Sequence, residues 1–128
     1  MFQNAFHNRP VFVTGHTGFK GSWLCHWLLR LGAHVHGYAL DPKPHETLFD
    51  KLGLSSRITS DVRADVRDAQ ALSNALVQSK PDFVLHLAAQ PLVRLSFEIP
   101  VDTFATNVMG TVNLLDSLRR LDHPCSVV

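Results

Sequence analysis

The chain has 128 residues, enough for one domain with its own core, and its 45% hydrophobic and 18% charged residues are ordinary for a soluble globular protein. The formal net charge of +1 excludes a strongly basic surface for nucleic acid or membranes, and no apolar run approaches the roughly 20 residues that span a bilayer. The first ten residues lack the apolar core of a signal peptide, and Cys25 and Cys125 show no paired spacing, so we expect a cytoplasmic protein.

A glycine-rich turn follows the first apolar run. Residues 11–13 predict a buried strand, a helical pattern begins at Ser22, and Gly15, Gly18 and Gly21 stand between them. A strand that turns sharply into a helix brings free N–H groups and the positive end of the helix dipole to one point, which favours a phosphate. Gly15 permits the tight turn, Gly18 lets a pyrophosphate approach the backbone, and Gly21 lets the helix pack against the strand. This context predicts a dinucleotide site, with a purely structural turn as the alternative.

The first helix is expected over residues 22–31, because apolar residues recur along it at helical spacing and Gly32 follows as a left-handed cap. Residues 34–40 are typical of a second strand, which completes a right-handed, parallel β–α–β unit. The apolar helix face that we predict comprises Trp23, Leu24, Trp27, Leu28 and Leu31.

The end of the second strand is where NAD and NADP are distinguished. An acidic side chain there accepts hydrogen bonds from the ribose hydroxyls, whereas a basic one accommodates a 2′-phosphate. Asp41 is the only acid available at this point and we expect no arginine nearby, so Asp41 is predicted to bind the ribose and NAD to be favoured. A turn-initiating aspartate before Pro42 is the alternative interpretation of Asp41, and Lys43 keeps NADP open.

The middle of the chain gives weaker signals. A short helix is expected over residues 45–52, with Gly53 at its end. A third strand is expected within residues 58–65, although residues 61–63 and residues 65–67 offer two competing registers.

A further helix and strand follow. Asp68 is expected to cap the helix and Pro81 to end it. Residues 83–87 predict a buried fourth strand that runs into Ala88 and Ala89, whose small side chains would let a flat cofactor lie against the backbone. The buried side of the helix is expected to comprise Leu72, Ala75, Leu76 and Ser79.

The last helix is expected to start near Pro100, with Gly110 inside it as a point of close approach to another element or to the ligand. Residues 126–128 look like the opening of another strand. The sequence thus predicts an α/β, Rossmann-type parallel sheet with helices on both faces, incomplete at four strands plus the start of a fifth. The apolar stripe that we predict on the last helix comprises Val101, Phe104, Val108, Val112, Leu115 and Leu118.

Three segments carry a family resemblance. They read Gly-His-Thr-Gly-Phe-Lys-Gly-Ser-Trp at 15–23, His-Leu-Ala-Ala-Gln-Pro-Leu-Val-Arg at 86–94 and Asn-Val-Met-Gly-Thr at 107–111. Together they resemble the extended short-chain dehydrogenase/reductase family, and within it the subgroup of CDP-glucose 4,6-dehydratases. The resemblance covers nearly the whole chain from Val11 onward. It implies that residues 1–128 are the N-terminal portion of an NAD-binding Rossmann domain, with the second half of the sheet and a substrate domain outside them.

The resemblance implies tightly held NAD and a nucleotide-sugar substrate, CDP-glucose. Hydride leaves C4 of the hexose, water is lost across C5 and C6, and hydride returns to C6 to give CDP-4-keto-6-deoxyglucose. It also implies a homo-oligomeric full-length enzyme, adenine recognition by Asp65 and Val66, and support of the active-site geometry by Asn107. The cofactor-binding residues expected on all these grounds are Gly15, Thr17, Gly18, Phe19, Gly21, Asp41, Asp65, Val66, Leu87, Ala88, Ala89 and Gln90.

The family's catalytic residues are a tyrosine and a lysine four positions later. Tyr38 is the single tyrosine of the chain and has Pro42 four positions on, so we expect these 128 residues alone to be inactive. We also expect them to fold poorly, because half of a doubly wound sheet leaves the apolar edge of the fourth strand uncovered. Lys20 and Arg94 are weaker candidates for substrate contact. The alternatives are another nucleotide-sugar dehydratase or epimerase, and a stand-alone NAD-binding or regulatory module.

Eight histidines raise the question of a metal. His34 and His36 share a predicted strand face, but a zinc site requires about three or four protein ligands. We therefore expect no metal site.

Overall fold

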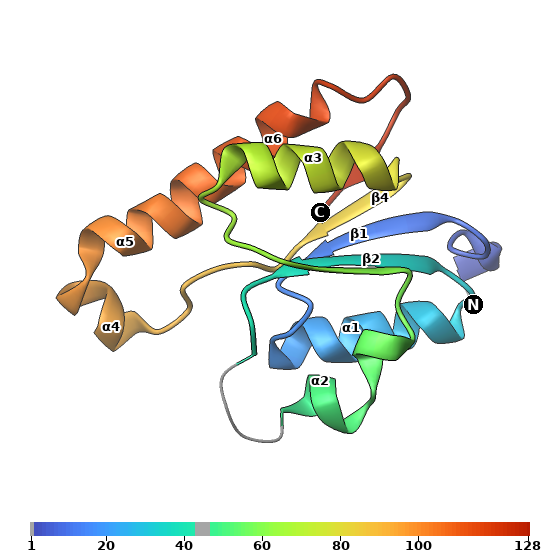
Figure 1. Cartoon of the computed structure of the whole chain (residues 1–128), viewed down its shortest axis with the longest axis horizontal. Helices are drawn as coiled ribbons and strands as arrows, with labels where there is room; N and C mark the ends of the chain where they lie inside the picture. The colour runs from blue at the N-terminus through green and yellow to red at the C-terminus, as the bar shows by residue number, and fades with distance from the viewer. Residues whose placement is uncertain (1, 43–46) are drawn as a thin grey trace.

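The computed structural model describes residues 2–42 and 47–128 and has a parallel sheet with helices on both faces (Figure 1). The strands are β1 (Pro10–Thr14), β2 (His34–Ala39), β3 (Ser60–Arg63), β4 (Phe83–His86) and β5 (Ser126–Val127). The helices are α1 (Phe19–Arg30), α2 (Leu48–Lys51), α3 (Ala69–Ser79), α4 (Val93–Glu98), α5 (Pro100–Phe104) and α6 (Gly110–Leu118). A π-helical turn, η3 (Ala105–Met109), joins α5 to α6, and two 3₁₀ turns are η1 (Phe2–Asn4) and η2 (Leu54–Ser56).

The five strands are all parallel, in the order β3-β2-β1-β4-β5. The chain moves outward from β1 to β3 and then crosses back to β4 on the other side of β1. This reversal creates a switch point at the carboxyl ends of β1 and β4, where open α/β sheets bind their ligands. The predicted Rossmann-type fold is therefore confirmed.

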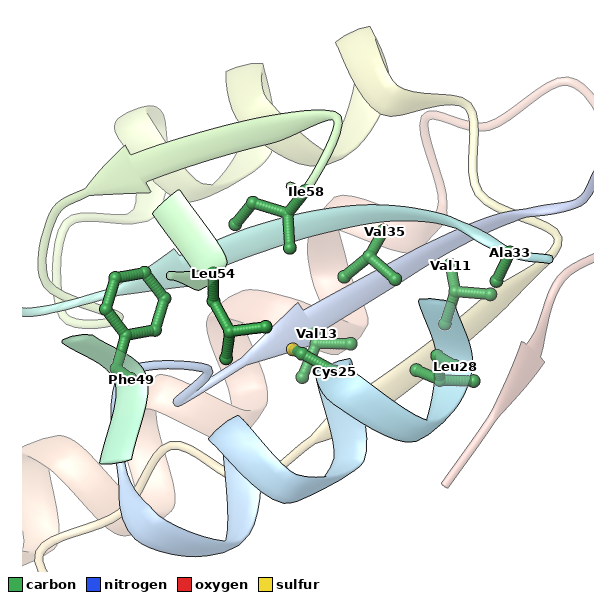
Figure 2. Close-up of a cluster of buried hydrophobic side chains, with 9 residues drawn as sticks. All are labelled: Val11, Val13, Cys25, Leu28, Ala33, Val35, Phe49, Leu54 and Ile58. Atoms are coloured by element: carbon green, nitrogen blue, oxygen red, sulfur yellow. The ribbon is translucent and has the colours of Figure 1, made fainter. Parts of the chain in front are cut away.

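Two apolar layers hold the sheet. α1 and α2 cover one face and α3 and α6 cover the other, as Figure 1 shows. Alternating side chains of the central strands point into the two layers because strand side chains alternate between faces. The first layer, drawn in Figure 2, comprises Val11, Val13, Cys25, Leu28, Ala33, Val35, Phe49, Leu54 and Ile58. The second comprises Phe12, Tyr38, Val66, Leu72, Leu76, Val84 and Leu114.

The predicted apolar face of α1 is wrong in part. The helix begins at Phe19, one turn earlier than the sequence indicated, and Gly32 ends it with φ of +80° as expected. Trp23 and Trp27 face outward with 51% and 45% of their surface exposed. The buried face of α1 instead comprises Gly21, Ser22, Cys25 and Leu28. The first three have small side chains, which let the helix lie close to the sheet.

The predicted stripe on the last helix is also wrong. Its members are mostly exposed, from 47% for Val112 to 80% for Val101, and the buried residues of α6 are Gly110, Leu114 and Ser117. Those three lie at helical spacing, with Leu114 in the second layer beside Leu72 and Leu76 of α3. Because glycine and serine contribute little to an apolar pattern, the opposite, solvent-facing stripe gave the stronger sequence signal.

The remaining elements follow the predictions more closely. β3 adopts the register of residues 61–63, and Asp68 caps α3 by accepting a hydrogen bond from the Ala71 amide. α4 has no counterpart in the sequence prediction. The start of the predicted helix over 45–52 lies outside the described residues, as does Lys43. No helix within 2–42 and 47–128 combines the length and apolar character that crossing a membrane requires.

Candidate functional site at the carboxyl ends of β1 and β4

Gly15 sits at the switch point, directly after β1. Its φ of +73° lies in the left-handed region, and its amide donates to the Tyr38 carbonyl at 2.9 Å. A Cβ at this position would lie 2.8 Å from the Ala88 amide nitrogen, so the turn and the segment after β4 are in close backbone contact. Glycine is required here for conformation and for space.

Gly18 and Gly21 have different surroundings. A Cβ on Gly21 would overlap the Gly15 carbonyl oxygen, so this glycine lets α1 pack against the turn. A Cβ on Gly18 would meet only the same oxygen, at 3.3 Å, and Gly18 itself is exposed. As N-cap, Gly18 supplies no capping side chain, and the first turn of α1 holds no acid. The start of this helix therefore presents backbone N–H groups without a competing negative charge.

A polar network fixes the segment after β4. Oγ1 of the buried Thr14 accepts from the Leu87 and Ala88 amides, both at 3.1 Å, and lies 2.6 Å from Nδ1 of His86. Nε2 of His86 lies 3.2 Å from Oγ1 of Thr111, which donates to the Asn107 carbonyl at 2.8 Å. Since Thr14 already accepts twice, its proton goes to Nδ1, and His86 carries its own proton on Nε2. Burial lowers the pKa of His86, which keeps this ring neutral.

Asn107 lies in the π-helical turn and binds Gln90 twice. The Gln90 amide donates to Oδ1 of Asn107 at 2.7 Å, and Nδ2 of Asn107 donates to the Gln90 carbonyl at 3.0 Å. The Gln90 side chain is engaged as well, with Leu92 and Thr103. π-helical turns inside α-helices are frequent at functional sites. This pair holds the end of the 87–90 segment against the continuous helical stretch of α5, η3 and α6, which we call the central helix.

The end of β2 carries an ion-pair chain that the sequence analysis missed. Nη1 of Arg63 lies 3.2 Å from Oδ1 of Asp41. The expectation that no arginine lies near Asp41 is therefore wrong. Arg63 also grips Asp61 with two hydrogen bonds, of 2.6 and 2.7 Å. The two strand ends meet because Ala39 pairs with Arg63 in the β2–β3 register. Only this register, which the sequence left open, brings Arg63 to Asp41.

His16 links the glycine turn to that chain. Its fully buried ring donates from Nε2 to Oδ1 of Asp61 at 2.7 Å, crossing β2 at Gly37, where a Cβ would overlap the ring. Burial, the largest effect, lowers the pKa of His16 despite the neighbouring carboxylate. Burial by itself raises the pKa of Asp61, but hydrogen bonds from Arg63 and His16 bring it below its usual value. In the sequence, a glycine inside a strand, here Gly37, is the feature that indicates a close approach of this kind.

The expected adenine-binding pair is held tightly. Both Asp65 oxygens accept hydrogen bonds from Arg67, through the backbone amide at 2.9 Å and the guanidinium at 2.7 and 2.9 Å, and the side-chain bond lowers the pKa of Asp65 most. The Val66 side chain is buried against Gly110, where an added Cβ would lie 2.7 Å from Cγ2 of Val66. The close approach expected at Gly110 is thus to Val66.

The remaining residues predicted to bind cofactor or substrate do not form one cluster. Thr17 donates to the Leu40 carbonyl at 3.0 Å and so ties the glycine turn to the end of β2. Phe19, Lys20 and Ala89 are exposed. Arg94 is 97% exposed on α4, which extends beyond the sheet in Figure 1, with Glu98 as a distant partner at 3.8 Å.

Tyr38 is a structural residue. Its fully buried hydroxyl donates to the Asp65 carbonyl at 2.8 Å, and burial, with help from Asp68 and Asp65, raises its pKa to about 12. A hydroxyl in this position cannot reach the switch point as a base. Among the described residues no group of three or more histidine, cysteine or acidic side chains could hold a metal ion. His36 instead bonds Ser60.

Comparison with known proteins agrees with this geometry. The family model described as GDP-mannose 4,6 dehydratase matches residues 12–127. The chain belongs to the GDP-mannose 4,6-dehydratase family. It is 48% identical over 126 residues to a CDP-glucose 4,6-dehydratase of Salmonella typhimurium, covering 98% of this chain and 35% of that relative. The chain therefore spans about a third of the length of this dehydratase.

Solved structures show the same fold. A UDP-glucose 4-epimerase of Thermus thermophilus, in complex with NAD, is 32% identical with a TM-score of 0.73, over 86% of this chain and 33% of that one. The epimerase Mth375 of Methanothermobacter thermautotrophicus is 26% identical with a TM-score of 0.80, over 93% of this chain and 34% of that one. This member of the 4,6-dehydratase family thus shares its fold with a UDP-glucose 4-epimerase and with the epimerase Mth375.

Proposed function

We propose that this chain is the NAD-binding part of a nucleotide-sugar 4,6-dehydratase that acts on CDP-glucose. The observation that carries the proposal is the Gly15–Gly18–Gly21 turn, which places the uncapped start of α1 at the β1/β4 switch point. The 48% identity to a CDP-glucose 4,6-dehydratase supports the substrate. The NAD complex of the Thermus epimerase supports the cofactor.

The residues fit a dinucleotide in three places. The exposed Gly18 and the first N–H groups of α1 hold the pyrophosphate, because they combine open space with a positive dipole end. Asp41 accepts from the adenosine ribose and Asp65 faces the adenine. The segment of Leu87, Ala88, Ala89 and Gln90 lines the path toward the nicotinamide, and its position is set by Thr14 and Asn107.

The nicotinamide, when bound, supplies removal and return of a hydride, which lets a hexose lose water. This chain's contribution is to bind and orient. The neutral His86 and Thr14 carry defined protons and hold the segment after β4 rigid, so the reacting end of the site is prearranged. Asn107 extends this support from the central helix. Lys20 and Arg94 are exposed and can reach solutes such as a sugar nucleotide.

We further propose that these 128 residues alone do not turn over CDP-glucose. The one tyrosine of the chain is committed to the Asp65 carbonyl, so the tyrosine–lysine pair that the resemblance implies does not lie within them. General acid–base help of this kind typically contributes about 10²–10⁴-fold. Sugar-nucleotide epimerization remains the second candidate for the whole enzyme, because solved structures that share this fold are epimerases.

Calorimetric titration of the chain with NAD and with ADP tests the proposal. We expect both to bind, with ADP accounting for most of the affinity, and Gly18→Val to abolish binding while far-UV circular dichroism stays unchanged. Ser55→Val, an exposed substitution on η2, is the control for an added branched side chain and should bind as the parent does. A folded Gly18→Val variant with the parent's affinity would contradict the pyrophosphate assignment.

A further inference from the structure

The corner formed by the ends of β2 and β3 contains an acid and a base in contact. Asp41 has 83% of its side chain exposed, whereas Arg63 is 26% exposed, and their closest atoms are 3.2 Å apart. In this fold an acid at the end of β2 favours the ribose hydroxyls of NAD, and an arginine there accommodates the 2′-phosphate of NADP. This corner holds both.

Arg63 is held in place without Asp41. Two hydrogen bonds, from Nε and Nη2, tie the guanidinium to Asp61, and its Cζ lies 4.9 Å from the centre of the Phe49 ring. Asp61 is in turn fixed by the buried His16. A planar guanidinium gripped along one edge and stacked on a ring keeps its orientation, so Nη1 remains aimed at the position that Asp41 occupies.

Asp41 is the movable member of the pair. Among the described residues Arg63 is the one partner that its carboxylate has, and Thr17 bonds the Leu40 carbonyl, not Asp41. An exposed ion pair of this kind contributes little stability. The aspartate can therefore turn away or be removed while the arginine stays.

We propose that Arg63 is a specificity-determining residue for the cofactor, a preformed donor to a 2′-phosphate that Asp41 masks. The proposal rests on the NAD site described above. With Asp41 present, the corner of Asp41, Asp61, Arg63 and the neutral His16 carries one net negative charge and disfavours a phosphate. Without Asp41 the corner is neutral and offers a directed N–H, so NADP gains.

The proposal predicts that the effect of replacing Asp41 on the ratio of NADP to NAD affinity depends on whether Arg63 is present. Asp41→Ala should raise the ratio of NADP to NAD affinity by about tenfold or more, the size of a hydrogen bond to a charged group. In the Arg63→Gln background the same substitution should give a clearly smaller gain, because it still removes one negative charge but no guanidinium remains to donate to the phosphate. A simple loss of repulsion by Asp41 would raise the ratio equally in both backgrounds.

The test is calorimetry with NAD, NADP and the smaller pair 5′-AMP and adenosine 2′,5′-bisphosphate, which report on this corner alone. The proteins are the parent chain, Asp41→Ala, Arg63→Gln, the double variant, and Asp116→Ala. Asp116 is the matched control, since it is an exposed partner of Arg119 at 3.3 Å on α6. Glutamine keeps a donor toward Asp61, and Arg63→Met, which keeps the aliphatic stem without the charge, replaces it where circular dichroism shows unfolding.

The expected result is a gain in affinity for both 2′-phosphorylated ligands on Asp41→Ala that is clearly smaller in the Arg63→Gln background. An equal gain in both backgrounds overturns the role of Arg63 and leaves the NAD site standing. Failure of the folded parent to bind any of the four ligands overturns the NAD site itself.

Discussion

Gly110 of α6 lies directly against Val66, so that a Cβ on the glycine would lie 2.7 Å from Cγ2 of the valine. This contact joins the central helix to the loop after β3. It is further fixed by Nδ2 of Asn113, which donates to the Val66 carbonyl at 3.0 Å. The loop that carries the proposed adenine-binding residues is thus positioned by a helix that also carries Asn107.

Gly110→Ala is expected to destabilise the chain by about 1–3 kcal/mol, because the added methyl overpacks the contact with Val66. Val66→Ala removes the methyl groups that the new Cβ would meet. The double variant should therefore be more stable than the sum of the two single effects indicates. Urea denaturation of the four proteins gives this coupling, and additive effects would contradict the contact.

Leu114→Ala and Leu115→Ala separate the buried face of α6 from its exposed stripe. Leu114 is 1% exposed and Leu115 is 51% exposed, so the first substitution should cost about 2–5 kcal/mol and the second within about 0.5 kcal/mol. Both variants lose the same atoms from the same helix. Equal losses in chemical denaturation would show that the helix faces the sheet differently.

Gly21→Ala and Gly18→Ala should differ in what they damage. A methyl at 21 overlaps the Gly15 carbonyl oxygen, so α1 must shift, and we expect a loss of about 1–3 kcal/mol in the free energy of unfolding. A methyl at 18 meets that oxygen at 3.3 Å and should leave stability nearly unchanged while weakening ADP binding. Thermal unfolding and calorimetry on the same samples measure both quantities. The reverse pattern would exchange the two roles.

Stability should fall as the pH drops below about 6.5. Burial lowers the pKa of His16, His36 and His86 in the folded chain, so the unfolded chain binds more protons in this range. A lowered histidine pKa contributes stability that is present above the unfolded pKa and is lost on acidification. The lowered pKa of Asp61 adds a second loss, below about pH 4.

Urea denaturation between pH 7.5 and 5 measures the first loss. His16→Asn should reduce the slope of unfolding free energy against pH, because one of the three titrating rings is gone. Ser55→Asn, an exposed substitution on η2 that introduces the same side chain without removing a titrating group, is the control and should leave the slope unchanged. An unchanged slope in His16→Asn would mean that His16 titrates alike in the folded and unfolded chains.

The sequence by itself determined the strand–turn–helix unit, because its signals are local. Val11 and Val13 form a short apolar run that a buried parallel strand needs, and Gly15 marks a backbone conformation that other residues avoid. Asp68 as a cap and Gly32 as a helix end are likewise decided within a few residues of the chain.

Only the tertiary structure decided which helix faces are buried and which charges meet. Trp23 and the stripe through Val112 have the right periodicity but face solvent, because small residues on the opposite sides permit closer packing than large ones. Asp41 and Arg63 are 22 positions apart, and their contact depends on the register of β2 against β3. A one-residue shift in that register turns Arg63 to the other face of the sheet, and no local pattern records which register the strands adopt.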